Sequence, residues 1–327
     1  MANVQKYFEE FHETIRVDYD AIRGKRDIIL DRLRKHLKDK NRPNFDELHQ
    51  GSYAMGVGIA PMGELEYDLD IGLRFQISAR DYSAEKVYGW VFEGVQGHTD
   101  KVEQKGHCVR VAYAQGDFHV DLVCYSWEKD NSGIEIFKLA HKTKGWLPGN
   151  PPGLLMYVEQ KRKPFEETKD SRTQTDQFRR CVRYLKRWND CAIPVEGDNK
   201  PTGLSFVLLC ADWLQPRFFI DGKPDDLTAL RNLTLSASAV AGRIVAMKPT
   251  PEYEDILLKL TADDMDAFKN RFKILSTVLE NAAREADPVK ACALLLAVFG
   301  DDFPAPTPDD TAKKTAAPAI ITSSSSA

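Results

Sequence analysis

The sequence contains no uninterrupted hydrophobic run that approaches the roughly 20 residues of a membrane-spanning helix. Its N-terminus, MANVQKYFEEFHETI, is charged and amphipathic and lacks the continuous apolar stretch of a signal peptide. The 6 cysteines include no C-x-x-C pair, and a chain of this length needs no disulfides to fold. We therefore expect a cytoplasmic protein with reduced cysteines, no zinc site and no membrane partner.

The chain also has little net charge, with 45 lysines and arginines against 49 acidic residues and a formal charge of −4. A protein that binds long nucleic acid is usually more basic, so the composition favours a small anionic ligand over long nucleic acid. Hydrophobic residues make up 43% of the sequence, which excludes a wholly disordered chain. At 327 residues the chain exceeds the size at which one core stops growing, and we predict two lobes.

The first half of the sequence changes from helical to strand periodicity. Apolar residues at helical spacing predict a helix over residues 5–40, broken near Val17. The strict alternation of residues 67–75 predicts a strand, and residues 108–113, 118–125 and 134–139 resemble further strands. Gly116-Asp117 would form the turn between two of them.

The second half is helical after a segment, GWLPGNPPG at residues 145–153, whose glycines and prolines predict a loop. One helix face should carry Phe178, Val182, Leu185 and Trp188. Thr261 and Asp264 predict a capping box, and a last helix should run from Asp287-Pro288 to Gly300.

We predict an α+β protein in three parts. Residues 1–160 would form a lobe around a mixed sheet, with the long N-terminal helix, and residues 161–304 a helical lobe. Residues 305–327 contain no aromatic residue and end in a serine run, so we expect a flexible tail. A cleft between two lobes is a common place for a ligand.

Three carboxylates are the candidate catalytic group. Asp68 and Asp70 lie two apart on the predicted strand, so both point to one face while Tyr67, Leu69 and Ile71 enter the core. Asp121 alternates with Val120 and Leu122 on a later strand. If the two strands are neighbours, the three carboxylates converge as hard oxygen ligands for Mg²⁺ or Mn²⁺. Two such ions would clamp the oxygens of a phosphoryl displacement. A D-x-D pair on a strand is equally often a solvated face.

Gly51-Ser52, between a short strand and a predicted helix, is the candidate phosphate-binding turn. Gly51 permits close approach of the backbone to a phosphate, and Ser52 adds a hydroxyl. The start of the following helix would add amide donors and a positive dipole. A Gly-Ser pair alone usually marks only a turn. The pattern becomes specific because Gly51-Ser52, the Asp68/Asp70 pair and Asp121 follow one another in this order.

In that order the motifs resemble the polymerase-β-like nucleotidyltransferases, whose signature is Gly-[Gly/Ser], a spacer, Asp-h-[Asp/Glu]-h and a later acidic residue. Here the pattern is Gly51-Ser52, fifteen residues, Asp68-Leu-Asp70-Ile and then Asp121. The sequence is more narrowly similar to the bacterial CD-NTases (cGAS/DncV-like nucleotidyltransferases), which make cyclic oligonucleotide second messengers in anti-phage systems. The closer features are HQGSYAMGVGIAP, EYDLDIGL, HVDLV, the NPPG segment and the helix around Arg183. The resemblance covers roughly residues 10–300.

The resemblance implies a polymerase-β-like core with flanking helices, a C-terminal helical lobe like that of oligoadenylate synthase, and an active site in the cleft between them. Asp68 and Asp70 would bind both of two Mg²⁺ or Mn²⁺ ions, and Asp121 would hold the one that activates the acceptor ribose hydroxyl. The donor triphosphate would lie on the remaining residues that match the family: Gln50, Gly51, Ser52, Lys186 and Ser205.

Charge independently favours Lys186, since residues 161–190 contain ten basic and five acidic side chains. In the alternative interpretation, Lys186 lies on the solvated face of its helix and Ser205 is only a helix N-cap.

The function that the resemblance implies is template-independent joining of ATP and GTP into a cyclic oligonucleotide, such as cyclic GMP-AMP, with release of pyrophosphate. Such products serve anti-phage (CBASS) signalling, and an operon partner would act on the C-terminal tail. Two alternatives remain open at this stage. One is a nucleotidyltransferase whose acceptor is an RNA end, a protein or a small molecule, and the other is a non-catalytic nucleotide sensor.

Overall fold

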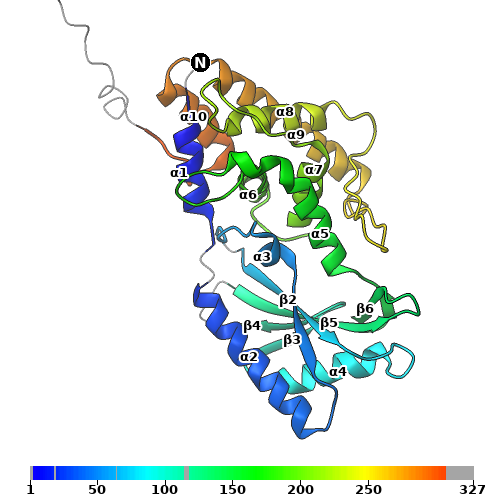
Figure 1. The fold of residues 1–327 in the computed structure, drawn as a ribbon. Coiled ribbons are helices and arrows are strands. Elements are labelled where there is room, and N and C mark those ends of the chain that lie inside the picture. The colour runs from blue at the N-terminus through cyan, green and yellow to red at the C-terminus, as the bar shows by residue number, and fades with distance from the viewer. Residues whose placement is uncertain (1–2, 18–19, 64, 114–117, 307–327) are drawn as a thin grey trace, which may run out of the picture.

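A computed structural model describes residues 3–17, 20–63, 65–113 and 118–306 (Figure 1). The chain forms a sheet-containing lobe and a helical lobe, as predicted. The expected turn at Gly116-Asp117 and most of the expected tail, residues 307–327, lie outside the described residues. Among the residues described, no helix is both long and apolar enough to cross a membrane.

In the part of the chain that the structure describes, the sheet lobe is built on seven strands in the order β1-β2-β5-β4-β3, with β6 paired to β5 and β7 to β6. The pair β2·β5 is parallel and the other pairs are antiparallel, so the predicted mixed sheet is confirmed. The strands are β1 (Phe45–His49), β2 (Tyr67–Phe75), β3 (Lys101–Gln104), β4 (Val109–Ala112), β5 (Phe118–Lys129), β6 (Glu135–His141) and β7 (Gly145–Pro148).

Helices α2 (Asp20–Asp39) and α4 (Ala84–Val95) cover one face of this sheet (Figure 1). Alternate residues of β2, among them Tyr67, Leu69 and Ile71, are buried in the core that these helices close. Because successive side chains of a strand point to opposite faces, Asp68 and Asp70 project from the other face, toward the helical lobe.

The predicted N-terminal helix is two helices, α1 (Gln5–Ile15) and α2, with the break near Val17 as expected. Packing divides the chain differently from the predicted boundary at residue 160. Phe8 and Phe11 of α1 and Val158 of α5 (Pro151–Arg162) lie in the core of the helical lobe. The aromatic face of α1 packs on Tyr184 of that lobe: Phe11 stacks on its ring at a centroid distance of 5.3 Å, and Phe8 lies tilted against it at 5.2 Å.

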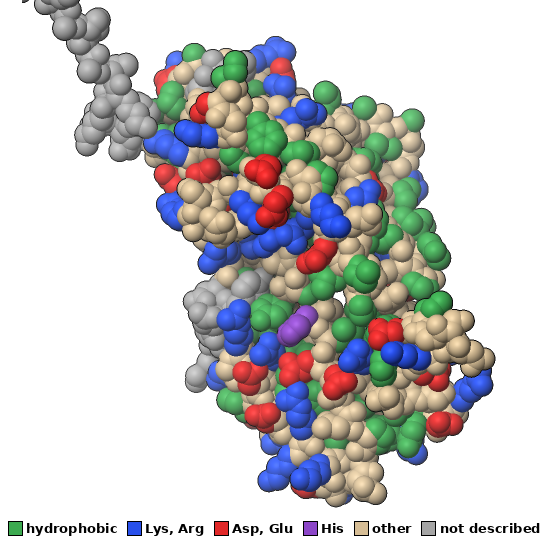
Figure 2. All heavy atoms as spheres, viewed as in Figure 1, with side chains coloured by type: hydrophobic (Ala, Val, Ile, Leu, Met, Phe, Trp, Pro, Cys, Tyr) green, Lys and Arg blue, Asp and Glu red, His purple; other side chains and the backbone are tan. Residues whose placement is uncertain are grey.

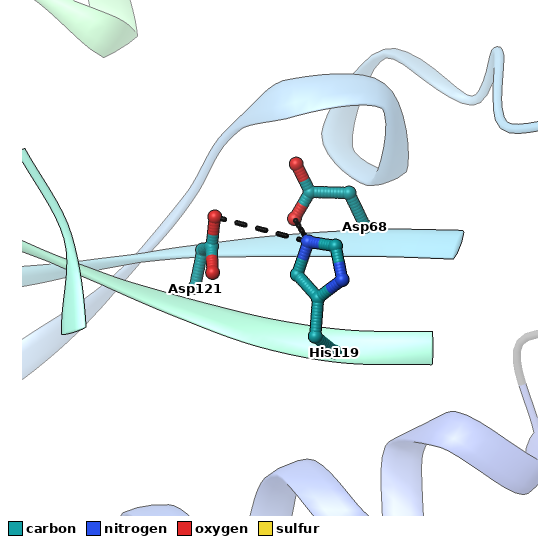
Figure 3. Close-up of side chains that lie close together, drawn as sticks. All are labelled: Asp68, His119 and Asp121. Atoms are coloured by element: carbon teal, nitrogen blue, oxygen red, sulfur yellow. Dashed lines mark ion pairs between the residues drawn. The ribbon is translucent and has the colours of Figure 1, made fainter. Parts of the chain in front are cut away.

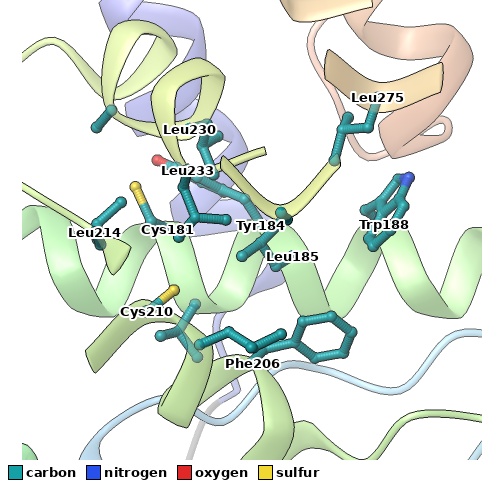
Figure 4. Close-up of a cluster of buried hydrophobic side chains, with 14 of the residues drawn as sticks. Cys181, Tyr184, Leu185, Trp188, Phe206, Cys210, Leu214, Leu230, Leu233 and Leu275 are labelled. Carbon is teal, nitrogen blue, oxygen red and sulfur yellow. The ribbon is translucent and has the colours of Figure 1, made fainter. Parts of the chain in front are cut away.

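The helical lobe surrounds one central helix, α6 (Gln177–Ala192), whose predicted apolar face is buried together with Cys181 and Tyr184 (Figure 4). The capping box of Thr261 and Asp264 and the end of the last helix at Gly300 are confirmed. The remaining elements are η1 (Lys163–Thr168), α7 (Gly203–Trp213), α8 (Asp226–Ser238), α9 (Ala262–Arg284) and α10 (Pro288–Phe299).

The loop predicted for residues 145–153 is wrong in part. Residues 145–148 form β7, which pairs with β6 after a turn in which Gly145 adopts a φ of 76°. Asn150 caps α5 by accepting a hydrogen bond from the amide of Gly153, and prolines occupy the first helical positions. Glycine and proline therefore mark a turn and a helix start here, with little loop between them.

A buried ion pair joins α6 to α8. Arg180 donates to both carboxylate oxygens of Asp226 at 2.7 and 2.8 Å, and both side chains are fully buried. Gln177 and Tyr184 donate to the same carboxylate. Burial alone would raise the pKa of Asp226, but Arg180 and these donors hold it below its usual value.

Asp226→Asn is expected to lower the free energy of unfolding by about 3 kcal/mol, because it leaves the buried Arg180 charge uncompensated. Urea unfolding of the two proteins at neutral pH measures the difference. A loss below about 0.5 kcal/mol would show that the ion pair does not stabilise the helical lobe.

Candidate active site

A cavity of about 770 Å³ lies between the two lobes, and Figure 2 shows the molecule hollowed where they meet. The sheet lobe contributes Gly51, Ser52, Asp68, Asp70 and His119, and the helical lobe contributes Lys186 and the start of α7. A volume of this size suits a small-molecule ligand. The cavity therefore brings together most of the residues that the sequence singled out.

The predicted convergence of the three carboxylates is confirmed by the strand register. In the parallel pair β2·β5, Asp70 lies beside Asp121 and Asp68 beside His119. Burial raises the pKa of Asp70 well above its usual value, and the neighbouring Asp68 and Asp121 carboxylates raise it further. Asp68 and Asp70 line the cavity, and Asp121 is buried beside Asp70. The repulsion among the three carboxylates favours a cation at this point.

His119 lies at the centre of this carboxylate group (Figure 3). Its Nε2 is 3.1 Å from Oδ1 of Asp68 and 4.0 Å from Oδ2 of Asp121, while its Nδ1 is 3.0 Å from Oε2 of Glu66. Burial disfavours the charged ring, but the carboxylates of Asp68 and Asp121 outweigh it and raise the pKa of His119. His119 lies two residues before Asp121 on β5, so the two side chains share one face of the strand.

Arg110 was missed by the sequence analysis. It donates to both oxygens of Asp121, at 2.8 and 2.7 Å, from the neighbouring strand β4. The antiparallel register places Arg110 directly opposite Asp121. Predicting that register would have found the pair, but the alternation within each strand does not set it.

The residues fit a divalent metal ion. Atoms of Asp68, His119 and Asp121 lie within 4.8 Å of one another, and Oδ1 of Asp68 is buried without a well-aligned hydrogen bond. Carboxylate oxygens are the ligands that Mg²⁺ and Mn²⁺ prefer, and a cation would relieve the repulsion that raises the pKa of Asp70. Asp68, Asp70 and Asp121 are the residues that would hold it.

The turn at Gly51 lies against these carboxylates. Gly51 has a φ of 66°, and a Cβ atom built there would be 2.3 Å from Oδ2 of Asp70. Only glycine therefore lets the backbone approach so closely. Helix α3 (Gly51–Met55) begins at this residue, and Ser52 and Gln50 line the same cavity. The side-chain oxygen of Gln50 accepts a hydrogen bond from Tyr125 at 3.0 Å.

Lys186 reaches the cavity from α6 on the opposite side. Its Nζ donates to the carbonyl oxygen of Val57 at 3.1 Å. Burial lowers the pKa of Lys186 to about 8, with a further contribution from Arg183 and an opposing one from the acidic side chains nearby. A bound anion would therefore raise the pKa of Lys186 and favour its charged form.

The affinity of the protein for an inorganic triphosphate is expected to fall as the pH rises from 7 to 9. Lys186 loses its proton in the free protein around pH 8, whereas a bound polyanion favours the protonated amine. Calorimetric titration of wild-type and Lys186→Gln proteins with tripolyphosphate, from pH 7 to pH 9, measures this change in affinity. The variant should bind about tenfold more weakly at pH 7 and lose this part of the pH dependence. Equal pH profiles for both proteins would contradict the role of Lys186.

The structure does not bring Ser205 into the cavity. Ser205 is fully buried at the third position of α7, and its hydroxyl donates to the carbonyl oxygen of Thr202. Thr202 is the N-cap residue, so Ser205 is not the helix cap either. The cavity wall at this point is formed instead by residues 202–204 and Phe206.

The basic excess in residues 161–190 has a structural use. Arg162 and Arg179 pair with Asp176, and Arg180 pairs with Asp226. Of the ten basic residues, Lys186 is the one that lines the described cavity. The excess of basic residues therefore does not by itself indicate a phosphate site, although Lys186 lies at the cavity.

Three further lysines line the cavity from the helical lobe and had no sequence signal. They are Lys200, Lys248 and Lys259, which come from connections far apart in the chain. Lys200 is buried and pairs with Asp190 at 2.9 Å and Glu196 at 3.2 Å. Their convergence depends on how α6, α7 and α9 pack, which the sequence did not reveal.

Comparison with known proteins agrees with this geometry. Residues 45–125 match the family described as the nucleotidyltransferase domain of DncV-like cyclic GMP-AMP synthases. A c-di-GMP synthase of Roseivirga ehrenbergii is 24% identical over 183 residues, 51% of this chain and 48% of the relative. The match thus spans about half the length of that relative.

Solved structures share the fold over nearly the whole chain. CdnC of E. coli MS115-1, solved with ATP, has a TM-score of 0.63 at 14% identity, covering 91% of this chain and 98% of that one. CdnG of Bradyrhizobium diazoefficiens, a CD-NTase solved with GTP, has a TM-score of 0.66 at 15% identity, with 92% and 96% covered. DncV of Vibrio cholerae, a cyclic AMP-GMP synthase, has a TM-score of 0.62 at 17% identity, with 91% and 86% covered. Gly51, Asp68, Asp70 and Asp121 all lie inside the segment that matches the DncV-like nucleotidyltransferase domain, and the chain shares the fold of the CD-NTases.

Proposed function

We propose that this protein is a metal-dependent, template-independent nucleotidyltransferase that joins nucleoside triphosphates into a cyclic oligonucleotide. The proposal depends mainly on one observation: Asp68, Asp70 and Asp121 lie together beside the Gly51 turn. They do so at a cavity that Lys186 lines from the other lobe. Carboxylates for metal ions and donors for a triphosphate are what nucleotidyl transfer needs.

In the proposed reaction, Gly51, Ser52 and Lys186 hold the triphosphate of a donor nucleotide. A ribose hydroxyl of the acceptor nucleotide, placed near Asp121, attacks the α-phosphorus of the donor. The bond from the α-phosphorus to the bridging oxygen breaks, pyrophosphate leaves, and the hydroxyl proton passes to solvent. Two Mg²⁺ or Mn²⁺ ions would lower the pKa of the hydroxyl and stabilise the leaving group. The protein contributes positioning and electrostatic stabilisation.

A second transfer in the same cavity would close the ring. We propose a purine product from ATP and GTP, such as cyclic GMP-AMP, made in the cytoplasm as an anti-phage (CBASS) signal. The names of the relatives support a cyclic dinucleotide and include both a cyclic AMP-GMP synthase and a c-di-GMP synthase. In this proposal the C-terminal tail is the segment on which an operon partner acts.

The proposal is tested by incubating the protein with all four nucleoside triphosphates and Mg²⁺ or Mn²⁺, each nucleotide labelled in turn at the α-phosphate. A phosphatase-resistant product that takes label from both ATP and GTP, and that is absent for the double variant Asp68→Ala/Asp70→Ala, is expected. A phosphatase-resistant product that takes label from GTP alone would identify the product as c-di-GMP and not cyclic GMP-AMP. Label transferred only when an RNA, a protein or a small-molecule acceptor is added would contradict a cyclic product.

A further inference from the structure

The segment that follows α3 is held by side chains from the other lobe. Four peptide carbonyls of residues 56–60 accept hydrogen bonds from one face of α6. Arg183 donates to Gly56 at 2.7 Å and to Gly58 at 3.1 Å, Lys186 donates to Val57 at 3.1 Å, and Arg187 donates to Ala60 at 2.8 Å. We call these carbonyls and their three donors the α6 clamp.

The α6 clamp lies next to the phosphate-binding turn. Gly56 ends α3 in the left-handed conformation, with a φ of 64°, and the amide of Val57 donates back to the carbonyl oxygen of Ser52 at 2.9 Å. A backbone hydrogen bond therefore connects residues 56–58 directly to Ser52 of that turn. Two glycines in three residues leave this segment many conformations of its own, so its geometry depends on the clamp.

Arg183 is the central member of the clamp and is buried. Its guanidinium group also contacts the ring of His12 on α1, with Nη1 3.1 Å from Nδ1. Burial, together with the Arg183 charge, lowers the pKa of His12 to about 3, so the ring stays neutral and can accept a hydrogen bond. His12 on α1 thus orients the planar guanidinium group while that group donates hydrogen bonds to two carbonyl oxygens. A lysine ammonium group does not have this planar arrangement of donors.

We propose that Arg183 is a positioning residue for triphosphate binding: its bonds to Gly56 and Gly58 hold the Gly51-Ser52 turn at the correct distance from Lys186. This inference rests on the proposed function, because it assumes that the triphosphate binds between that turn and α6. Arg183 acts through the peptide groups of residues 56–58 and not through the phosphates. Without it the turn must be ordered when the ligand binds, which weakens affinity.

The test measures binding of non-reactive α,β-methylene analogues of ATP and GTP, with Mg²⁺, to the full chain by calorimetry. Arg183→Lys retains the charge but loses the paired donors, and about tenfold weaker binding is expected. In turnover assays KM should rise by a similar factor while kcat stays within about threefold. Tyr184→Phe is the matched control: it removes hydrogen bonds to Phe8 and Asp226 on the same helix and leaves the clamp intact.

Tyr184→Phe should melt at a lower temperature and bind the analogues like the wild type. Arg183→Lys binding as tightly as the wild type, or a loss equal to that of Tyr184→Phe, overturns the inference. If Arg183→Lys does not fold, Arg187→Met tests the same clamp through its bond to Ala60, with the same expected direction. A wild-type protein that binds neither analogue overturns the proposed function itself, which separates the two failures.

Discussion

Asp70→Asn is expected to fold normally and to lose nucleotidyl transfer by about three orders of magnitude or more. The substitution keeps the shape of the side chain and removes the charge that would bind both metal ions. Burial and the carboxylates of Asp68 and Asp121 already raise the pKa of Asp70, so the neutral amide relieves repulsion in the free protein. Its melting temperature should therefore equal or exceed that of the wild type, while initial rates of pyrophosphate release fall.

Asp46→Asn provides the matched control. Asp46 lies on the neighbouring strand β1 and pairs with Arg74 at 3.1 Å, and its side chain is 69% exposed. The same chemical change there should leave turnover within about twofold, because exposed ion pairs contribute little. Near-normal turnover by Asp70→Asn would refute the metal site, and equal losses from both variants would point to a general effect of removing charge.

Gly51→Ala should reduce turnover by about a hundredfold. The new methyl group would be placed 2.3 Å from Oδ2 of Asp70, and the backbone φ of 66° is itself unfavourable for alanine. Either the Asp70 carboxylate or the Gly51-Ser52 turn must move. In the proposed reaction the carboxylate binds the metal ions and the turn binds the triphosphate, so either movement slows the reaction. Single-turnover rates at saturating nucleotide and Mg²⁺ measure the effect.

Gly97→Ala separates steric contact from backbone strain. Gly97 has a similar φ of 73°, but a Cβ atom there would meet nothing within 4 Å. It should lose stability, by about 1 kcal/mol, and retain activity. Gly51→Ala turning over as fast as Gly97→Ala would show that the approach of the turn to Asp70 is not needed for catalysis.

The sheet and its carboxylates could be predicted because they depend on local alternation. The period of two in residues 67–75 determines which side chains are buried, and the same rule places Asp121 on its strand. The parallel pairing of β2 with β5 brings these side chains together, a pairing that the alternation alone left as a condition.

What the sequence could not show depends on packing between distant segments. The pairing of Arg110 with Asp121 needs the register of β4, and the convergence of Lys200 and Lys248 needs the arrangement of the helical lobe. Ser205 lies in the core and not at the cavity, because a shift of one or two residues along a helix turns a side chain from one to the other. The packing of α1 with the helical lobe was likewise hidden, since an apolar helix face does not by itself indicate which of two cores it joins.

The most direct test of the metal-dependent active site is the rate of pyrophosphate release from ATP plus GTP, measured with Mg²⁺, with EDTA in its place, and with Asp68→Ala/Asp70→Ala. The arrangement of Asp68, Asp70 and Asp121 beside Gly51 predicts release only from the wild-type protein with the metal ion. Nucleotide binding that needs no metal ion, with no pyrophosphate released under either condition, would contradict catalysis and support a nucleotide sensor.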